Sequence, residues 1–248
     1  VPLSFNAEPF FSFTEGMLTL DPEAYSLRWY QEILNDPKWI LAIKNSFFIG
    51  ILSTILATIL GTCAAVGLAR DEMPFRRFIT ALLLSPMIVP LIITAAGMFF
   101  FYSNLGLAGG YLGVILAHAA LGTPFVIITV TATLTGFDYS LARAALNLGA
   151  TPIRVFFDVI MPLIRPGVIS GALFAFITSF DEVVVILFMA GPQQRTIPRQ
   201  MFSGLREQIN PSILAIATLL ILLSIALLVT LELLRRRAER MRGIEIPH

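Results

Sequence analysis

The sequence predicts an all-α integral membrane protein whose helices cross the bilayer five times. Of its 248 residues, 13% are charged and 56% are hydrophobic, and the mean hydropathy is +0.82. A soluble domain carries about 25% charged residues, so much of the usual charge is missing. Three runs of 25, 60 and 24 residues contain no Asp, Glu, Lys or Arg. About 20 apolar residues suffice to span a bilayer.

The same composition argues against other classes of protein. The net charge is +1, from 17 Lys and Arg against 16 Asp and Glu. Such a balance lacks the basic footprint of a nucleic-acid binder. The single cysteine excludes an internal disulfide and a multi-cysteine metal site. We therefore expect membrane lipid around the chain, with no nucleic acid and no metal ion.

The charge-free runs define the spans in order. The 60-residue run is too long for one helix, and it breaks at 102–111, where Gly, Ser and Asn cluster. The fourth span is apolar except for Asp181 and Glu182, which lie in its outer half. The five predicted spans cover residues 45–69, 78–101, 112–134, 167–191 and 212–234.

Arginine and lysine placement predicts the orientation. With the C-terminus inside, the inner side holds 11 of these residues and the outer side 6. Residues 1–44 are then an outer segment, and 45–234 form the transmembrane domain with a long inner loop at 135–166. Residues 235–248 are an inner basic tail. Because nothing resembling a signal segment precedes the outer segment, we expect a sixth span upstream of residue 1.

The inner loop has the pattern of two short helices. Asp138 and Thr151 are suited to cap them, and Gly149 is suited to end the first. We expect Pro162 and Pro166 to prevent further helix. On these grounds alone the pair is either a docking element or a plain connector.

The residues of this loop resemble the EAA loop of ABC-importer permeases. That pattern has Glu-Ala-Ala, three residues, Gly, and an Ile-x-Leu-Pro group about a dozen residues later. Here Ala144, Ala145 and Gly149 match, and Pro162 follows Gly149 by 13 positions. Arg143 stands where the pattern has Glu.

Further segments resemble the PotC-type permeases of spermidine and putrescine importers. They are 27–30 (LRWY), 180–185 (FDEVVV), 191–192 (GP) and 197–198 (IP). This resemblance implies the type I, MetI-like permease fold with six spans, in a bacterial inner membrane, with a cytoplasmic C-terminus. It implies an importer subunit forming half of the translocation pathway, most simply for polyamines. An opine, an amino acid or another small amine is the alternative substrate.

The resemblance also implies a division of labour. Separate ATP-binding cassette subunits would bind ATP and Mg²⁺, a PotB-like chain would be the second permease, and a periplasmic binding protein would deliver substrate. The chain itself lacks a P-loop, because neither of its two lysines, Lys38 and Lys44, follows Gly. We therefore expect no enzyme activity in this chain. The residues expected to dock on the ATPase are Arg143, Ala144, Ala145, Gly149 and Arg154.

The acid pair is the most informative intramembrane feature. A charged Asp at a helix centre costs about 2.5–3.5 kcal/mol, and such groups mark substrate or ion paths. Adjacent helical residues point about 100° apart. We therefore expect Asp181 to face the pathway and Glu182 to face a neighbouring helix. Alternatively, both acids hold a loop by pairing with Arg195 or Arg199.

Aromatic residues gather at the outer end of the second span. Phe99 and Tyr102 could stack on a cationic substrate or close a gate, or belong to the interfacial aromatic belt. Trp29, Tyr30 and Trp39 are expected on an outer amphipathic helix. That helix would contact the binding protein or lie on the membrane surface.

Other polar and helix-breaking residues leave alternatives open. A lone intramembrane imidazole, His118, predicts a helix-to-helix hydrogen bond more readily than proton coupling. Pro86, Pro90 and Pro124 would either kink their spans or merely pack. A short outer helix is expected from Pro198 to Glu207.

Two other functional classes fit less well. An intramembrane enzyme needs catalytic groups that converge at membrane depth, whereas Asp181 and Glu182 are adjacent and point apart. A secondary transporter would favour inverted repeats and acids in several spans, and the sequence has neither.

Overall fold

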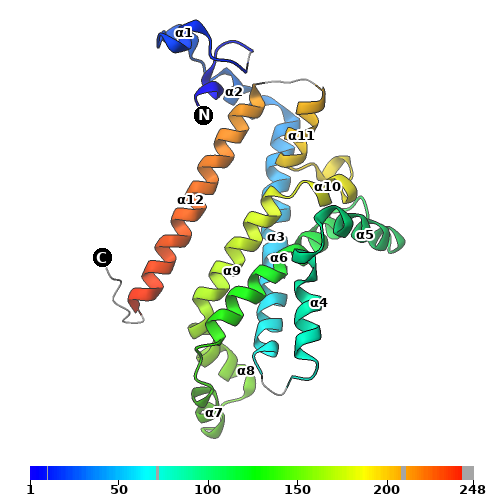
Figure 1. The fold of residues 1–248 in the computed structure, drawn as a ribbon, viewed down its shortest axis with the longest axis vertical. Helices are drawn as coiled ribbons and strands as arrows, with labels where there is room; N and C mark the ends of the chain where they lie inside the picture. The colour runs from blue at the N-terminus through cyan, green and yellow to red at the C-terminus, as the bar shows by residue number, and fades with distance from the viewer. Residues whose placement is uncertain (10, 71–72, 208–210, 242–248) are drawn as a thin grey trace.

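The structure, a computed structural model, describes residues 1–9, 11–70, 73–207 and 211–241. Within these residues the regular elements are helices, with one isolated antiparallel bridge between Asn6 and Tyr25. The prediction of an all-α protein is confirmed (Figure 1). The four longest helices are α3 (Pro37–Leu68), α6 (Tyr111–Leu134), α9 (Met161–Asp181) and α12 (Ser212–Met241).

Four helical segments are long and apolar enough to cross a membrane: 37–68, 111–134, 152–181 and 212–230. They correspond to four of the five predicted spans. The first begins at Pro37 rather than at residue 45, because Asp36 caps it. The Asp36 carboxylate accepts a hydrogen bond from the Lys38 N–H at 2.8 Å, and Pro37 occupies the first turn.

The remaining predicted span, 78–101, is bent rather than continuous. It consists of two helices, α4 (Arg76–Ile88) and α5 (Leu91–Asn104), which meet at an angle of 106°. Pro90 is the reason, because it has no N–H to donate and disfavours helical backbone at the residue before it. Val89 accordingly has an extended ψ of 136°. Of the two alternatives for this proline, the kink is confirmed.

The predicted span 167–191 also differs from the structure. Helix α9 ends at Asp181, and a separate short helix, α10, covers Val184–Met189. At its other end α9 continues directly from α8 (Pro152–Val155) through a π-helical turn, Phe156–Ile160.

The expectation that Pro162 and Pro166 prevent further helix is therefore wrong. Pro162 lies in the first turn of α9, directly after the π-helical turn. The π-helical turn has a looser hydrogen-bond pattern, which accommodates the missing proline N–H. Pro166 lies within the helix itself.

Helices α3, α6 and α9 pack closely through small residues. A Cβ added to Gly171 would lie 2.5 Å from Thr129 Oγ1, and one added to Gly61 would lie 2.6 Å from Val126 Cβ. A Cβ added to Gly167 would lie 2.6 Å from Thr133 Oγ1. Glycines thus allow these backbones to approach more closely than any other residue would.

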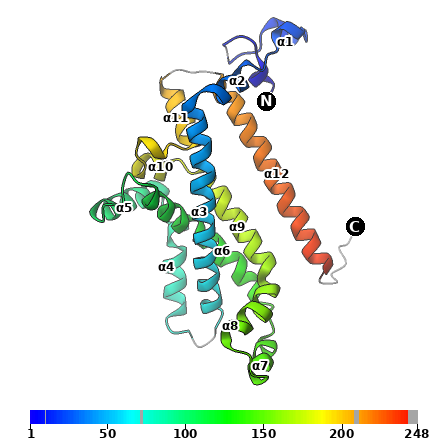
Figure 2. The ribbon, with the colours of Figure 1, turned by 180° about the vertical axis from the view of Figure 1, so that it is seen from behind.

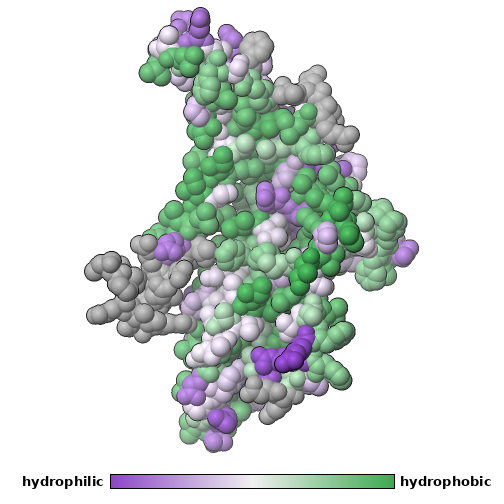
Figure 3. Space-filling model, in the orientation of Figure 1, coloured by the Kyte–Doolittle hydropathy of each residue, from purple (hydrophilic) through white to green (hydrophobic). Residues whose placement is uncertain are grey.

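The end of the molecule that carries α2 (Arg28–Asn35) and α11 (Ile197–Glu207) is called the outer end, following the predicted orientation. Helices α7 (Tyr139–Asn147) and α8 lie at the opposite, inner end (Figures 1 and 2). Both views show α12 diverging from α9 towards the inner end. Apolar surface covers most of the face in Figure 3, and hydrophilic residues gather at its two ends.

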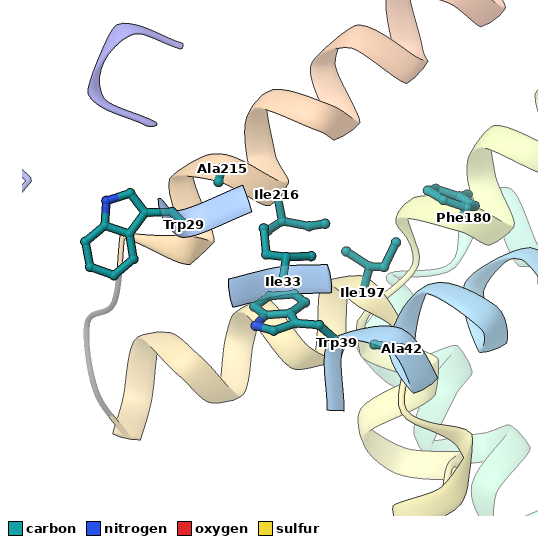
Figure 4. Packing of buried hydrophobic residues seen from close by; sticks show 8 residues of the cluster. All are labelled: Trp29, Ile33, Trp39, Ala42, Phe180, Ile197, Ala215 and Ile216. Atoms are coloured by element: carbon teal, nitrogen blue, oxygen red, sulfur yellow. The ribbon is translucent and has the colours of Figure 1, made fainter. Parts of the chain in front are cut away.

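The predicted outer amphipathic helix is α2, which carries Trp29 and Tyr30, whereas Trp39 lies on α3 and both tryptophans are buried within the chain. Trp29 of α2 is 3% exposed and Trp39 of α3 is 4% exposed. They pack with Ile33 and Ile197 against Ile216 at the outer end of α12 (Figure 4). The indole Nε1 of Trp29 donates to the carbonyl of Asn6 at 2.7 Å. These side chains therefore join the outer segment to α3 and α12.

Candidate functional site

The acid pair lies at a break between two helices. Asp181 is the last residue of α9 and is exposed, whereas Glu182 is 8% exposed. Glu182 has extended backbone, and its Oε1 accepts a hydrogen bond from the Val185 N–H at 2.9 Å. The two carboxylates thus point to different environments, as the sequence predicted.

This break brings a helix C-terminus and an exposed carboxylate together. The last carbonyls of a helix carry a partial negative charge, because they lack intrahelical partners. Helix α9 ends with Asp181, whose carboxylate adds a full charge to that end. A hydrophilic patch interrupts the apolar surface near the outer end of α9 (Figure 3). The chemistry of this site suits a cation.

The two arginines proposed as alternative partners of the acids bind neutral groups instead. Arg195 donates from Nη1 to Gln200 Oε1 at 2.9 Å. Arg199 donates from Nη1 to the carbonyl oxygens of Ala190 at 3.0 Å and Gly191 at 2.8 Å. These contacts argue against the alternative in which the acid pair holds the outer loop by ion pairs.

The aromatic candidates lie beside α10. Phe99 and Tyr102 of α5 are half-buried and pack against an apolar cluster that includes Val185, Ile186 and Met189. The structure therefore brings both rings to the short helix that starts directly after the acid pair.

His118 forms the predicted bond between helices. It is 1% exposed, and its Nδ1 lies 2.8 Å from the Oγ of Ser179, which connects α6 to α9. Ser179 lies one helical turn before Glu182. The imidazole therefore fixes the outer end of α9 next to the break, although its Nε2 has no hydrogen-bond partner among the described residues.

A separate cavity of about 430 Å³ lies between α3, α9 and α12. Its lining is apolar apart from Thr54 and contains none of the predicted pathway residues. Such a lining suits hydrocarbon rather than a charged solute. The lining residues are Ile51, Thr54, Ile55, Ile169, Ala172, Leu173, Phe176 and Leu227.

The inner loop has the predicted caps. The Asp138 carboxylate accepts from the Ser140 N–H at 2.8 Å, and hydrogen bonding to Ser140 lowers the pKa of Asp138. Thr151 Oγ1 accepts from the Arg154 N–H at 3.4 Å at the start of α8. Gly149 has a φ of +87°, the left-handed conformation expected of a residue that ends a helix.

The backbone after α7 closes as a Schellman motif. The Gly149 N–H donates to the carbonyl of Leu146 at 2.9 Å, and the Ala150 N–H donates to that of Ala145 at 3.1 Å. This turn directs the chain from α7 into α8 over four residues.

The predicted docking residues lie on an accessible surface. Arg143, Ala144, Gly149 and Arg154 are exposed, and Ala145 is half-buried. Large apolar side chains accompany them: Leu148 is 88% exposed, Ile153 71% and Phe157 59%. A mixed basic and apolar surface of this kind is typical of a protein–protein contact.

Sequence reasoning missed the polar side chains that fasten the outer loop. Asn45 and Tyr111, at or near the outer ends of α3 and α6, bind the carbonyl of Gln193. The break after Asp181 was missed as well, because Val183, Val184 and Val185 contain no breaker. For the loop contacts, the one signal in the sequence was Asn45, a polar residue at the start of an apolar run.

Comparison with known proteins supplies the family context. The profile of the family described as "binding-protein-dependent transport system inner membrane component" matches residues 57–240. The chain is 32% identical over 226 residues to the spermidine/putrescine transport system permease protein PotC of Haemophilus influenzae, covering 91% of this chain and 88% of PotC. It is 36% identical over 222 residues to the putrescine transport system permease protein PotI of Escherichia coli, covering 85% and 78%.

Solved structures support the same fold. A bacterial ABC transporter involved in the import of the acidic polysaccharide alginate superposes with a TM-score of 0.68. The two sequences are 17% identical, and the match covers 91% of this chain and 86% of the other. At this identity the likeness concerns the fold alone.

Proposed function

This chain belongs to the family of binding-protein-dependent transport system inner membrane components, and we propose that it forms half of the translocation pathway of a polyamine importer. The observation that carries the substrate class is the identity of 32% and 36% to permeases of spermidine and putrescine systems over most of their length. The cation-attracting end of α9 agrees with it.

Asp181 is proposed as the group that holds the substrate during passage. Putrescine and spermidine carry ammonium groups at neutral pH, and an exposed carboxylate at a helix C-terminus attracts them twice over, by its charge and by the helix dipole. Broken helices that present their ends to a solute are a recurring device in transport proteins. Glu182 supports the site by capping α10.

Phe99 and Tyr102 are proposed to line the pathway beside α10. Their packing against Val185, Ile186 and Met189 places aromatic rings on the short helix that begins at the acid pair. An aromatic face attracts an ammonium group by about 0.5–2 kcal/mol, depending on its desolvation. The same rings could stack on the methylene segments of the substrate.

The inner loop is proposed to dock on a separate ATPase subunit, which binds ATP and Mg²⁺. The exposed apolar groups Leu148 and Ile153 supply contact area, and Ala144 permits a close approach. Arg143 and Arg154 would meet acidic groups of that partner. The chain itself then contributes movement rather than hydrolysis.

The remaining partners follow from the same proposal. A PotB-like chain would supply the second half of the pathway, and a periplasmic binding protein would deliver substrate at the outer end. The chain would lie in a bacterial inner membrane with its C-terminus in the cytoplasm, as the excess of inner arginines predicts.

Transport by the reconstituted complex tests this function. Proteoliposomes would receive the binding protein loaded in turn with putrescine, spermidine, an amino acid or an opine. Polyamine import with stimulated ATP hydrolysis is expected, and Asp181→Asn should abolish import while ATP hydrolysis persists. Import of the amino acid or opine alone would reject the polyamine assignment. Unchanged import by Asp181→Asn would reject the role of Asp181.

A further inference from the structure

The outer loop that follows α10 is fastened by a buried asparagine. Asn45, near the outer end of α3, is 4% exposed. Its Nδ2 donates to the carbonyl oxygens of Gln193 at 2.7 Å and Arg195 at 2.9 Å. Its Oδ1 accepts from the Tyr111 hydroxyl at 2.9 Å. Both N–H groups of this amide thus bind the loop, and its oxygen binds the tyrosine.

Two further side chains attach the same loop to the helix bundle. The Tyr111 hydroxyl, at the first residue of α6, also lies 3.0 Å from the carbonyl of Gln193. Ser46 Oγ, next to Asn45 on α3, accepts from the Ile197 N–H at 2.9 Å. Residues 190–197 are therefore connected to both α3 and α6.

Helix α11 and the loop before α6 fix the end of α10. Arg199 donates to the carbonyls of Ala190 and Gly191, which follow the helix directly. The Gly109 N–H donates to the carbonyl of Met189 at 2.8 Å. A helix of six residues is too short to be stable alone. Its position therefore depends on these contacts and on the Glu182 cap at its other end.

Close packing supports the same arrangement. A Cβ at Gly191 would lie 3.0 Å from the carbonyl oxygen of Gly109, and 2.9 Å from Gln194 Oε1. The loop after α10 is therefore pressed against the loop before α6, where Gly109 has a φ of +78°. Residues 190–197 therefore have little freedom to move independently of α6.

We propose that Asn45 and Tyr111 are positioning residues that clamp loop 190–197 to α3 and α6, so that α10 and the acid pair before it stay fixed while substrate passes. The consequence for transport rests on the proposed function. The clamp itself does not, because it is a property of the outer end of this chain. It makes α3, α6, loop 190–197 and α10 one rigid unit.

The first test measures the clamp without any transport. Cys63, which is exposed, would be replaced by Ser, and spin labels would be placed at Gln193 and Leu60 of the complex in nanodiscs. Leu60 lies on α3, about 22 Å along the axis from Asn45 at 1.5 Å per residue. We expect one narrow distance distribution in the parent, and a broad or shifted one in Asn45→Ala and Tyr111→Phe.

Ser53→Ala is the matched control. Ser53 Oγ donates to the carbonyl of Ile115 at 3.2 Å, so it also joins α3 to α6 but does not touch the loop. Its distribution should equal that of the parent. Tyr111→Phe removes only a hydroxyl and keeps the test valid where Asn45→Ala lowers the yield of folded protein. Distributions of Asn45→Ala and Tyr111→Phe that both match the parent would overturn the clamp.

The second test measures the role of the clamp in transport. ATP hydrolysed per polyamine imported should rise about threefold or more in Tyr111→Phe, the scale expected when a coupling element is loosened. Ser53→Ala should keep the parent ratio. A broadened distribution with an unchanged ratio would reject the positioning role and leave the clamp as a structural feature. Absence of import in the parent would instead reject the proposed function, while the spin-label result would stand.

Discussion

The carboxylate of Glu182 accepts a hydrogen bond from the Val185 N–H at 2.9 Å, while its neighbour Asp181 remains exposed. The two acids therefore have separable roles. Glu182→Gln keeps an oxygen that can cap α10, whereas Glu182→Ala removes it, and loss of such a cap costs about 1 kcal/mol. We expect Glu182→Ala to lower the melting temperature of the complex. Glu182→Gln should have a melting temperature close to that of the parent.

Transport measurements on the same variants separate stability from substrate handling. Glu182→Gln should import polyamine at a rate close to that of the parent, unlike Asp181→Asn. If Glu182→Gln proved as defective in import as Asp181→Asn, and both were fully folded, Glu182 would also belong to the pathway.

Gly149 has a φ of +87°, and a Cβ added there would meet no atom within 4 Å. The effect of Gly149→Ala is therefore conformational rather than steric, and left-handed backbone costs a residue with a Cβ about 1–2 kcal/mol. We expect the turn between α7 and α8 to distort and the affinity for the ATPase subunit to fall about tenfold. Co-purification and titration of the labelled ATPase subunit measure this.

Gly136 is the matched control for Gly149. It also lies in the inner loop and has open space around its Cβ position, but no positive φ. Gly136→Ala should bind the ATPase subunit like the parent. Equal affinities for the Gly149→Ala and Gly136→Ala variants would show that the left-handed turn is unimportant for docking.

The sequence was most informative where one local rule decides the structure. Apolar runs predicted five spans, of which four are single long helices and one is a bent pair. Capping chemistry predicted the roles of Asp138, Gly149 and Thr151, because each depends on a few neighbouring residues. Asp181 and Glu182 do lie in different environments, but the helical spacing of about 100° is not the reason, because α9 ends at Asp181 and Glu182 has extended backbone.

The features that the sequence did not predict depend on contacts that no residue-type pattern marks. The break after Asp181 depends on Glu182 capping α10, and no glycine or proline marks it. Trp29 was expected on a surface because α2 is amphipathic, yet α12 covers its apolar face. Pro162 lies in a continuous helix because the preceding π-helical turn accommodates it.

Gly171 lies where α9 crosses α6, so a methyl group there must displace a neighbour. Its Cβ would come within 2.5 Å of Thr129 Oγ1 and 2.8 Å of Val126 Cα. Overpacking of this kind costs about 1–3 kcal/mol. We expect Gly171→Ala to lower the melting temperature by about 2–4 °C per kcal/mol.

Gly97 of α5 provides the comparison for Gly171, because nothing lies within 4 Å of its Cβ position. Alanine is favoured over glycine within a helix by about 0.5–1 kcal/mol. Gly97→Ala should therefore leave the melting temperature unchanged or raise it. A fall equal to that of Gly171→Ala would mean that close α6–α9 packing is not the cause.

The hydrogen bond between His118 Nδ1 and Ser179 Oγ predicts an energetic coupling of α6 to α9 next to the acid pair. Interhelical hydrogen bonds in membrane proteins average about 0.6 kcal/mol in double-mutant cycles. We expect His118→Ala and Ser179→Ala to be less destabilising together than the sum of their separate effects, by about that amount. Stability of the purified complex in each of the four states of the cycle measures this coupling.

The same variants distinguish a structural imidazole from a proton carrier. If His118 only joins two helices, Ser179→Ala should lower the rate of import because the outer end of α9 is less firmly held. The pH profile of import should be unchanged. His118→Asn, which retains a polar group for Ser179, should likewise import polyamine with the parent profile. A shifted or flattened pH profile in His118→Asn, with a normal melting temperature, would instead assign proton coupling to this histidine, because the variant would have lost the titrating group while keeping the structural contact.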